Sequence, residues 1–237
     1  MSRILVVEDE QHLAEGLRYN LEADEHEVEL ADTGEEALRQ LTELPRKYDL
    51  VVLDVMLPGI DGFAVTAELR RLGLYVPVLI LTARGGSEDV LSGFGAGADD
   101  YLTKPFELPI FLSRVRGLLR RHEWFRMDAA KRPATAEFAF RDKVIDFEQL
   151  EVRVGEKRMP LTVMEASLLR YLVENEGKPV ARKTILDRVW NVHEDTDTRA
   201  IDNFIVRLRR YIEVEPSRPR HLQTVRGVGY RFVAEPD

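Results

Sequence analysis

Residues 50–62 read LVVLDVMLPGIDG, and this stretch decides the fold of the first half of the chain. Its aliphatic run has no polar alternation, which indicates a strand buried on both faces, as in a parallel sheet covered by helices. The strand ends on Asp54, and a proline, two glycines and Asp61 follow as a turn. A lone aspartate in this place usually caps a turn or a helix, so its role depends on what ends the neighbouring strands.

The flanking sequence continues the alternation of short aliphatic runs and amphipathic segments up to residue 121. This rhythm predicts a doubly wound, flavodoxin-like α/β domain with parallel strands in the order 2-1-3-4-5. The expected strands are 4–7, 28–31, 50–53, 78–81 and 101–102, and the expected helices are 11–22, 35–43, 63–72, 87–94 and 107–121.

The pattern changes after residue 121. Residues 122–136 have no sustained period and predict a linker. Residues 137–237 predict a second, α+β domain with helix-turn-helix order. Its expected elements are a small antiparallel sheet over 138–161, helices at 163–175, 182–190 and 199–213, and a hairpin at 222–233. Thr162 and Glu165 have the spacing of a capping box for the first of these helices.

Charge is distributed unevenly between the two parts. Residues 1–122 carry 13 basic and 22 acidic side chains, whereas the remainder carries 21 basic and 20 acidic ones. Within the second part, residues 199–231 hold eight arginines and three acids. We therefore expect two domains with different partners, of which the C-terminal one suits a polyanion.

Composition excludes several functional classes. No apolar run approaches the roughly 18 residues that a membrane span needs, and the N-terminal segment MSRILVVEDE turns acidic too early for a secretory signal. We therefore expect a soluble, cytoplasmic protein with no membrane partner. The absence of cysteine excludes disulfides and thiolate catalysis, and it agrees with a reducing compartment.

The expected strand order brings reactive side chains to one edge of the sheet. Glu8 and Asp9 follow the first strand, and Asp54 ends the third strand beside it. Three carboxylates repel one another unless a cation lies among them, and a hard ion such as Mg²⁺ fits. Thr82 and Lys104 at the ends of the fourth and fifth strands add a hydroxyl and an ammonium group. Such a set can hold a phosphoryl group on a carboxylate.

The segments LVVEDE, LDVMLPGIDG, ILTAR and GADDYLTKPF resemble the receiver domain of two-component response regulators over residues 1–121. The resemblance implies that Asp54 is the phosphoacceptor, that a histidine kinase is the donor, and that Thr82 and Lys104 bind the phosphoryl oxygens. The implied ligands of Mg²⁺ are Glu8, Asp9, Asp54 and the carbonyl of Met56.

The same resemblance implies two conformational features. One is a cis peptide bond before Pro105. The other is an aromatic switch, in which Tyr101 turns inward when Thr82 moves toward the phosphate. From the residues alone, the preferred explanation of Tyr101 is a half-buried ring with its hydroxyl in water.

Residues 199–213 (RAIDNFIVRLRRYIE) predict an amphipathic helix with two distinct faces. The apolar stripe is Ile201, Ile205, Leu208 and Ile212, and the opposite face carries Arg199, Asn203, Val206, Arg207 and Arg210. A basic face of this kind can be merely solvated. Three features favour DNA instead: an asparagine among the arginines, the helix that precedes, and the hairpin with Arg226 that follows.

The segments LTVMEASLLRYL, VARKTILDRVW, TRAIDNFIVRLRRYIE and LQTVRGVGYRF resemble the winged-helix effector domain of OmpR/PhoB-type regulators over about 137–233. The resemblance implies that Asp202, Asn203 and Arg207 lie near base edges in the major groove and that Arg199 contacts phosphate. Arg226 in the wing would reach the minor groove. The residues implied to hold the wing to the core are Val225, Tyr230 and Phe232. Where the family often has a phosphate-binding histidine, this chain has Phe204, so we expect one phosphate contact fewer.

The receiver departs from the family at its dimer surface. The family usually pairs a basic residue after the fourth strand with an acid on the last helix, and the matching positions here are Val90 and Ile110. Asp100 and Arg114 match the family's other dimer pair. We expect phosphorylation to favour a homodimer with an interface that is more apolar and less salt-sensitive than usual. The alternative is that Val90 and Ile110 pack within one subunit.

These patterns leave one leading hypothesis and two alternatives. The leading one is a transcription factor in which phosphorylation of Asp54 pairs the receivers, so that two effector domains bind tandem DNA half-sites. The first alternative is an orphan regulator, permanently dimeric without phosphoryl transfer. The second is a phosphatase, but the haloacid dehalogenase type needs a second aspartate where this chain has Met56. We expect no turnover beyond self-phosphorylation from small donors and loss of the phosphoryl group.

Overall fold

The computed structural model describes residues 1–43, 47–83, 95–126, 137–190 and 200–236. The chain divides into two compact units, Met1–His122 and Glu123–Asp237. Helix α5 (Leu108–Arg126) extends past its predicted end at residue 121, so the first part of the expected linker is helical. Within the described ranges, no helix combines the length and the hydrophobicity that a membrane crossing requires.

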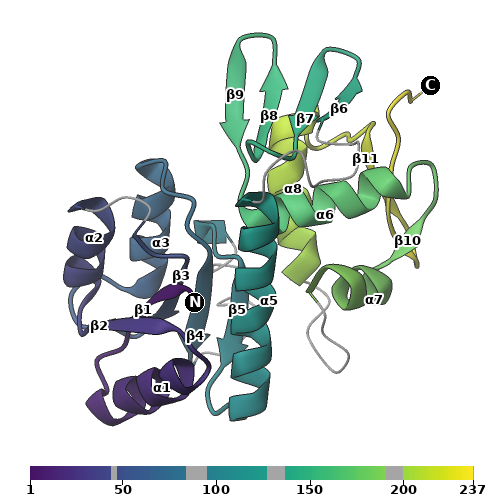
Figure 1. Ribbon diagram of the computed structural model, residues 1–237. Helices are drawn as coiled ribbons and strands as arrows, with labels where there is room; N and C mark the ends of the chain where they lie inside the picture. The colour runs from purple at the N-terminus through teal and green to yellow at the C-terminus, as the bar shows by residue number, and fades with distance from the viewer. Residues whose placement is uncertain (44–46, 84–94, 127–136, 191–199, 237) are drawn as a thin grey trace. The chain divides into compact units, whose positions relative to one another are not determined.

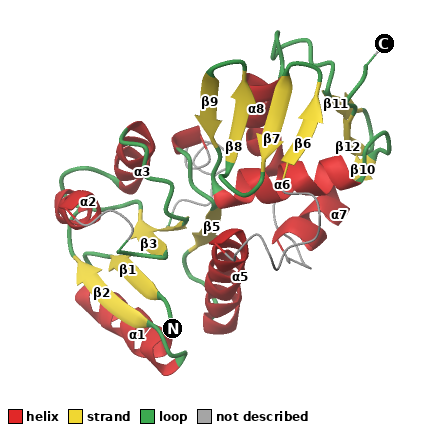
Figure 2. Cartoon of the chain, turned by 45° about the horizontal axis from the view of Figure 1, so that its top comes forward, coloured by secondary structure: helices red, strands yellow, loops and turns green. Residues whose placement is uncertain are grey.

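The first unit is built on a five-stranded parallel sheet in the predicted order β2-β1-β3-β4-β5. Its strands are β1 (Arg3–Val7), β2 (Glu27–Ala31), β3 (Leu50–Asp54), β4 (Val78–Thr82) and β5 (Asp100–Thr103). The other described helices are α1 (Gln11–Ala23), α2 (Gly34–Glu43) and α3 (Gly62–Arg71). Helix α1 covers one face of the sheet, and α2 and α3 cover the other, as Figures 1 and 2 show. The helix predicted at 87–94 lies outside the described residues.

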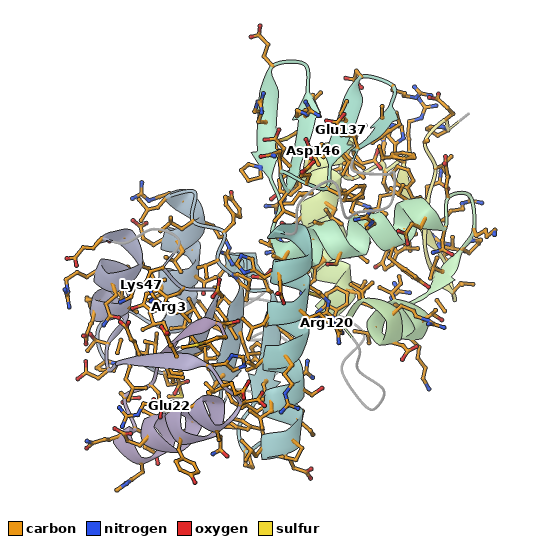
Figure 3. The ribbon with its side chains drawn as sticks, in the orientation of Figure 1. Arg3, Glu22, Lys47, Arg120, Glu137 and Asp146 are labelled. Carbon is orange, nitrogen blue, oxygen red and sulfur yellow. The ribbon has the colours of Figure 1, made fainter. Side chains whose placement is uncertain are left out.

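Burial explains why the central strands carry unbroken aliphatic runs. Every residue of β3 and β4 is buried, whereas the edge strand β2 alternates between exposed and partly buried positions before it ends on the buried Ala31. Charged pairs line that edge: Arg3 contacts Glu27 and Lys47 contacts Glu29, each at 2.6 Å, and Figure 3 labels both basic residues. Charges on an edge strand discourage pairing with a second sheet.

The turn after β3 explains the glycines and the second aspartate of the LPGIDG segment. Gly59 has a positive φ of 78°, which favours glycine. Asp61 caps α3 by accepting a hydrogen bond from the backbone N–H of Ala64 at 2.7 Å. A Cβ on Gly62 would lie 2.2 Å from the carbonyl oxygen of Asp54. The start of α3 therefore packs directly on the backbone of Asp54.

We expect Gly62→Ala to lower the free energy of unfolding of the first unit by about 1–3 kcal/mol, because the clashing atom is backbone and cannot rotate away. Gly16→Ala in α1 is the matched control, since a Cβ there meets no atom within 4 Å. It should stabilise the unit by about 0.5–1 kcal/mol through helix propensity. Calorimetry of the full-length variants measures both shifts. A Gly62→Ala transition at or above the wild-type temperature would contradict the packing described.

The second unit begins with a four-stranded antiparallel sheet in the order β6-β7-β8-β9, as the period-two alternation predicted. The strands are β6 (Glu137–Phe140), β7 (Lys143–Asp146), β8 (Glu151–Val154) and β9 (Lys157–Pro160). Glu137 and Asp146, labelled in Figure 3, are cross-strand partners, and Arg153 pairs with both carboxylates.

Helices and a second small sheet complete this unit. Helix α6 (Val163–Glu174) begins with the predicted capping box, in which Thr162 and Glu165 each accept a hydrogen bond from the other's backbone N–H. The remaining elements are β10 (Val180–Ala181), α7 (Arg182–Ile185), the π-helical turn η2 (Leu186–Trp190), α8 (Ala200–Ile212), β11 (Leu222–Val225) and β12 (Gly229–Phe232). The predicted hairpin is confirmed as β11 and β12, and β10 pairs with β12.

Candidate functional site

The carboxylates predicted to meet at the carboxyl edge of the parallel sheet do meet there. Val7 of β1 is in register with Leu53 of β3, which places Glu8 beside Asp54. The ligand oxygens of Glu8, Asp9 and Asp54 all lie within 4.8 Å of one another. Glu8 and Asp54 are buried, whereas Asp9 is exposed.

Lys104 is the cation of this cluster. Its Nζ donates hydrogen bonds to Glu8 Oε2 and to Asp54 Oδ2, each at 2.7 Å. Burial raises the pKa of Glu8, although the hydrogen bond from Lys104 opposes the effect. Burial disfavours the charge on Lys104, but the hydrogen bonds to Asp54 and Glu8 outweigh it and raise the pKa of Lys104. The lysine therefore stays charged while it bridges two buried carboxyl groups.

The strands position Lys104 and two further predicted residues. The backbone N–H of Lys104 donates to the carbonyl of Thr82 at 2.7 Å, and the Lys104–Pro105 peptide bond is cis, which confirms that prediction. Thr82 ends β4 and is fully buried. Tyr101 of β5 is only 8% exposed, so its ring lies in the core rather than half in water.

The donor set fits a hard divalent cation such as Mg²⁺. Among the residues that the structure describes, three carboxylates offer oxygen ligands while one lysine supplies a single positive charge, and Mg²⁺ prefers carboxylate oxygens together with water. The backbone N–H of Met56 donates to Asp54 Oδ1 at 3.1 Å, so the Met56 backbone adjoins the phosphoacceptor candidate. That the backbone carbonyl of Met56 is a ligand of Mg²⁺ stays a prediction.

The predicted dimer residues fall into two groups. Asp100 and Arg114 pair within one chain, because Arg114 Nη1 donates to both carboxylate oxygens of Asp100 at 2.8 and 2.9 Å. Ile110 is 45% exposed and Leu108 beside it is 39% exposed, so Ile110 is not packed inside the described part of its own subunit. Val90 lies outside the described residues.

In the second unit, α8 has the predicted apolar stripe. Ile201, Ile205, Leu208 and Ile212 are all fully buried. Phe204 is also fully buried, and its ring packs edge-on against Trp190 with 5.0 Å between centroids. A residue in the core cannot reach DNA, so Phe204 supplies no phosphate contact in this structure, and the expectation of one contact fewer stays a prediction.

Asp202, predicted near base edges, is held by two neighbouring elements. Its Oδ1 accepts from the Tyr230 hydroxyl of β12 at 2.5 Å and from Arg182 Nε of α7 at 3.0 Å. Burial and this hydrogen bond raise the pKa of Tyr230 to about 12. The aspartate thus joins α7, α8 and the wing strand. We did not anticipate Arg182, whose only signal in the sequence is its position at the start of a helix.

Arg207 requires a correction. We expected its side chain on the solvent face near base edges, but it is only 11% exposed and turned inward. Its Nε lies 3.0 Å from Oε1 of Glu165, whose side chain is 2% exposed. Its guanidinium carbon also lies 4.6 Å from the ring centre of Phe204. In this structure Arg207 ties α8 to α6 inside the unit.

The remaining predicted DNA residues differ in accessibility. Arg210 on α8 and Arg226 in the turn between β11 and β12 are exposed. Asn203 is partly buried, and its Nδ2 has no hydrogen-bond partner within the described residues. Arg199 lies outside the described residues. Tyr230 and Phe232 are buried, as expected for residues that hold the wing to the core, and Val225 is partly buried.

The first unit has a doubly wound sheet that carries a buried aspartate, an acidic cluster and a lysine at its carboxyl edge. A winged helix-turn-helix unit follows it. Together these features define a response regulator with a DNA-binding domain. The chain belongs to this family. Residues 4–137 match the response regulator receiver domain, and residues 155–232 match the C-terminal domain of transcriptional regulatory proteins. It is a transcription regulator of a two-component system, of the OmpR/PhoB type.

Particular relatives cover nearly the whole chain. The response regulator MprA of Mycobacterium bovis is 41% identical over 228 residues, which is 96% of both chains, and MprA of Mycobacterium ulcerans is equally similar. Among solved structures, a RitR mutant matches with a TM-score of 0.73 at 27% identity, over 98% of this chain and 99% of that one. The OmpR/PhoB homologue DrrB of Thermotoga maritima matches with a TM-score of 0.51 at 34% identity over the same shares.

Proposed function

We propose that Asp54 accepts a phosphoryl group from the phosphohistidine of a histidine kinase. The observation that carries this proposal is the 2.7 Å contact of Lys104 Nζ with Asp54 Oδ2 inside a buried acidic cluster. A carboxylate held beside a lysine and a set of metal-binding oxygens is suited to attack phosphorus.

In the proposed transfer, one oxygen of Asp54 forms a bond to phosphorus while the bond from phosphorus to the kinase histidine breaks. The electron pair of that bond returns to the imidazole nitrogen, which then takes up a proton. Lys104 and the Thr82 hydroxyl would meet the charge on the phosphoryl oxygens. A bound Mg²⁺, held by Glu8, Asp9 and Asp54, would supply further charge neutralisation. We propose only two reactions at this site. One is phosphorylation of Asp54, by the kinase or by a small phosphoryl donor, and the other is hydrolysis of the resulting aspartyl phosphate.

We further propose that the phosphorylated receiver forms a homodimer and thereby increases DNA binding. Pairing two receivers raises the effective concentration of the second effector domain at a neighbouring half-site, so affinity for tandem half-sites rises without any new DNA contact. Inward movement of Thr82 with Tyr101 is the proposed link between phosphate and dimer surface. In this structure Tyr101 already has the buried position that the switch assigns to the phosphorylated state, and Thr82 is buried as well.

Acetyl phosphate tests the phosphoryl transfer directly. The full-length protein, incubated with Mg²⁺ and acetyl phosphate, should gain a phosphoryl adduct in its intact mass and should then bind DNA more tightly. The exposed Leu108 and Ile110 favour one competing function, a permanently dimeric orphan regulator. Absence of the adduct together with unchanged, dimeric DNA binding would support that orphan function instead.

Ile110 provides a test of the apolar dimer surface. We expect Ile110→Lys to weaken dimerisation of the beryllofluoride-treated protein by about tenfold, because a half-exposed isoleucine that becomes buried contributes more than 1 kcal/mol. Leu72→Lys is the matched control, since Leu72 has a similar exposure, 43% against 45%, at the end of α3. Sedimentation at low and high salt measures both variants. A wild-type dimer that dissociates at high salt would contradict an apolar interface.

A further inference from the structure

Three of the charged side chains on α8 are held by the second unit itself. Asp202 and Arg207 have the contacts described above. Arg209 donates from Nε to the carbonyl of Leu222 at 2.9 Å and from Nη2 to the hydroxyl of Thr224 at 2.8 Å. A side chain fixed in this way must break a contact before it can meet a base edge. These three residues are therefore better placed to position α8 than to distinguish bases.

The outward strip of α8 has a different composition. Asn203, Val206 and Arg210 follow one another at intervals of three and four residues, which places them on one face of the helix, opposite the buried stripe. Val206 is at the centre of this strip and is 48% exposed. A β-branched apolar residue is thus displayed next to an exposed arginine, whereas Asn203 is partly buried.

We propose that Val206 determines base specificity by contacting the C5-methyl group of a thymine in the major groove. This proposal rests on the proposed function, DNA binding, with α8 in the major groove as the resemblance to winged-helix regulators implies. The thymine methyl is the apolar group that a base pair presents in the major groove, and apolar side chains are its usual partners. Valine suits this task, because its χ1 angle is nearly fixed in a helix and little side-chain freedom is lost on contact. The flanking Arg210 supplies the charge that a DNA surface requires.

Uracil substitution tests the contact without altering the protein. A preferred DNA site is first selected from a random pool with the full-length protein, and each thymine is then replaced singly by uracil, which lacks only the methyl group. We expect one thymine in each half-site to be sensitive, with binding weakened about three- to fivefold, the value for one methyl group removed from an apolar contact. Fluorescence anisotropy measures the dissociation constants.

The matched protein variant is Val206→Ala. It should bind the thymine site about three- to fivefold more weakly than the wild type, and it should no longer distinguish thymine from uracil at that position. Val214→Ala is the control, because Val214 is 95% exposed just beyond the end of α8. It should keep both the wild-type affinity and the sensitivity to uracil.

Each outcome decides the proposal. It is overturned if no thymine in the selected site is sensitive to uracil, or if Val206→Ala keeps the full penalty for uracil at the sensitive position. Failure of the proposed function has a different signature, since a chain that does not bind DNA would select no preferred site from the pool at all.

Discussion

The Asp54→Asn variant is expected to gain no phosphoryl adduct from acetyl phosphate and Mg²⁺ and to lose all phosphate-stimulated DNA binding. The substitution keeps the size of the side chain but removes the nucleophilic oxygen and the negative charge that Lys104 contacts at 2.7 Å. Intact mass measures the adduct, and anisotropy with a DNA probe measures binding before and after treatment. Basal DNA binding should persist, because Asp54 belongs to the first unit.

Asp61→Asn is the matched control. Asp61 lies at the far end of the loop that follows Asp54, but it is exposed and acts as the N-cap of α3, a position where asparagine is as favourable as aspartate. This variant should keep the adduct and the stimulation. If Asp54→Asn formed the adduct in wild-type yield, the phosphoacceptor would be another carboxylate, and the proposed chemistry would be refuted.

Arg207→Ala is expected to lower the free energy of unfolding of the second unit by about 3 kcal/mol. Removing one member of a buried ion pair leaves the other charge buried without its partner, which typically costs 3–5 kcal/mol. Glu165 is that partner, and its side chain is 2% exposed. Glu165 also closes the capping box of α6, so it cannot move to water without opening the first turn of that helix. Calorimetry of the full-length variant measures the loss.

Arg210→Ala separates this structural role from DNA contact. Arg210 lies on the same helix but is exposed, so its removal should change the free energy of unfolding by less than about 0.5 kcal/mol. It should weaken DNA binding and make that binding less dependent on the salt concentration. The opposite pattern would indicate that Arg207 contacts base edges. It would consist of wild-type stability for Arg207→Ala together with a loss of discrimination between DNA sites.

The sequence predicted the receiver fold closely, because the strands β1, β3 and β4 are built on unbroken aliphatic runs that lead into a polar residue. Every predicted strand of the first unit lies within the observed one, with differences of one or two residues at the ends.

Strand β10 of the second unit was missed, because a strand of two residues is too short to show a periodic pattern. Helix α5 extends to Arg126, beyond its predicted end at residue 121. The prediction ended too early because the last residues of the helix are too rich in polar and aromatic residues to show an apolar stripe.

The acidic site could be predicted for a geometric reason. In a parallel sheet the carboxyl ends of all strands lie on one edge, so the residue that ends each strand is brought to the same place whatever the packing details. Glu8, Asp54 and Lys104 therefore met as expected. The distances, the double contact of Lys104 and the close packing of Gly62 on the Asp54 backbone required the three-dimensional structure.

On α8, helical periodicity by itself determined which residues face the core, because a period of 3.6 depends only on the order of apolar and polar residues. It did not determine what each polar residue contacts. Arg207 and Arg210 look alike in the sequence, yet one is paired with a buried glutamate of α6 and the other is exposed. That difference arises from packing between segments about 40 residues apart, because the buried carboxylate of Glu165 needs a cation and Arg207 supplies it. The sequence alone thus determined the fold, the acidic edge of the sheet and the basic helix, and only the tertiary structure decided which side chains of that helix remain accessible.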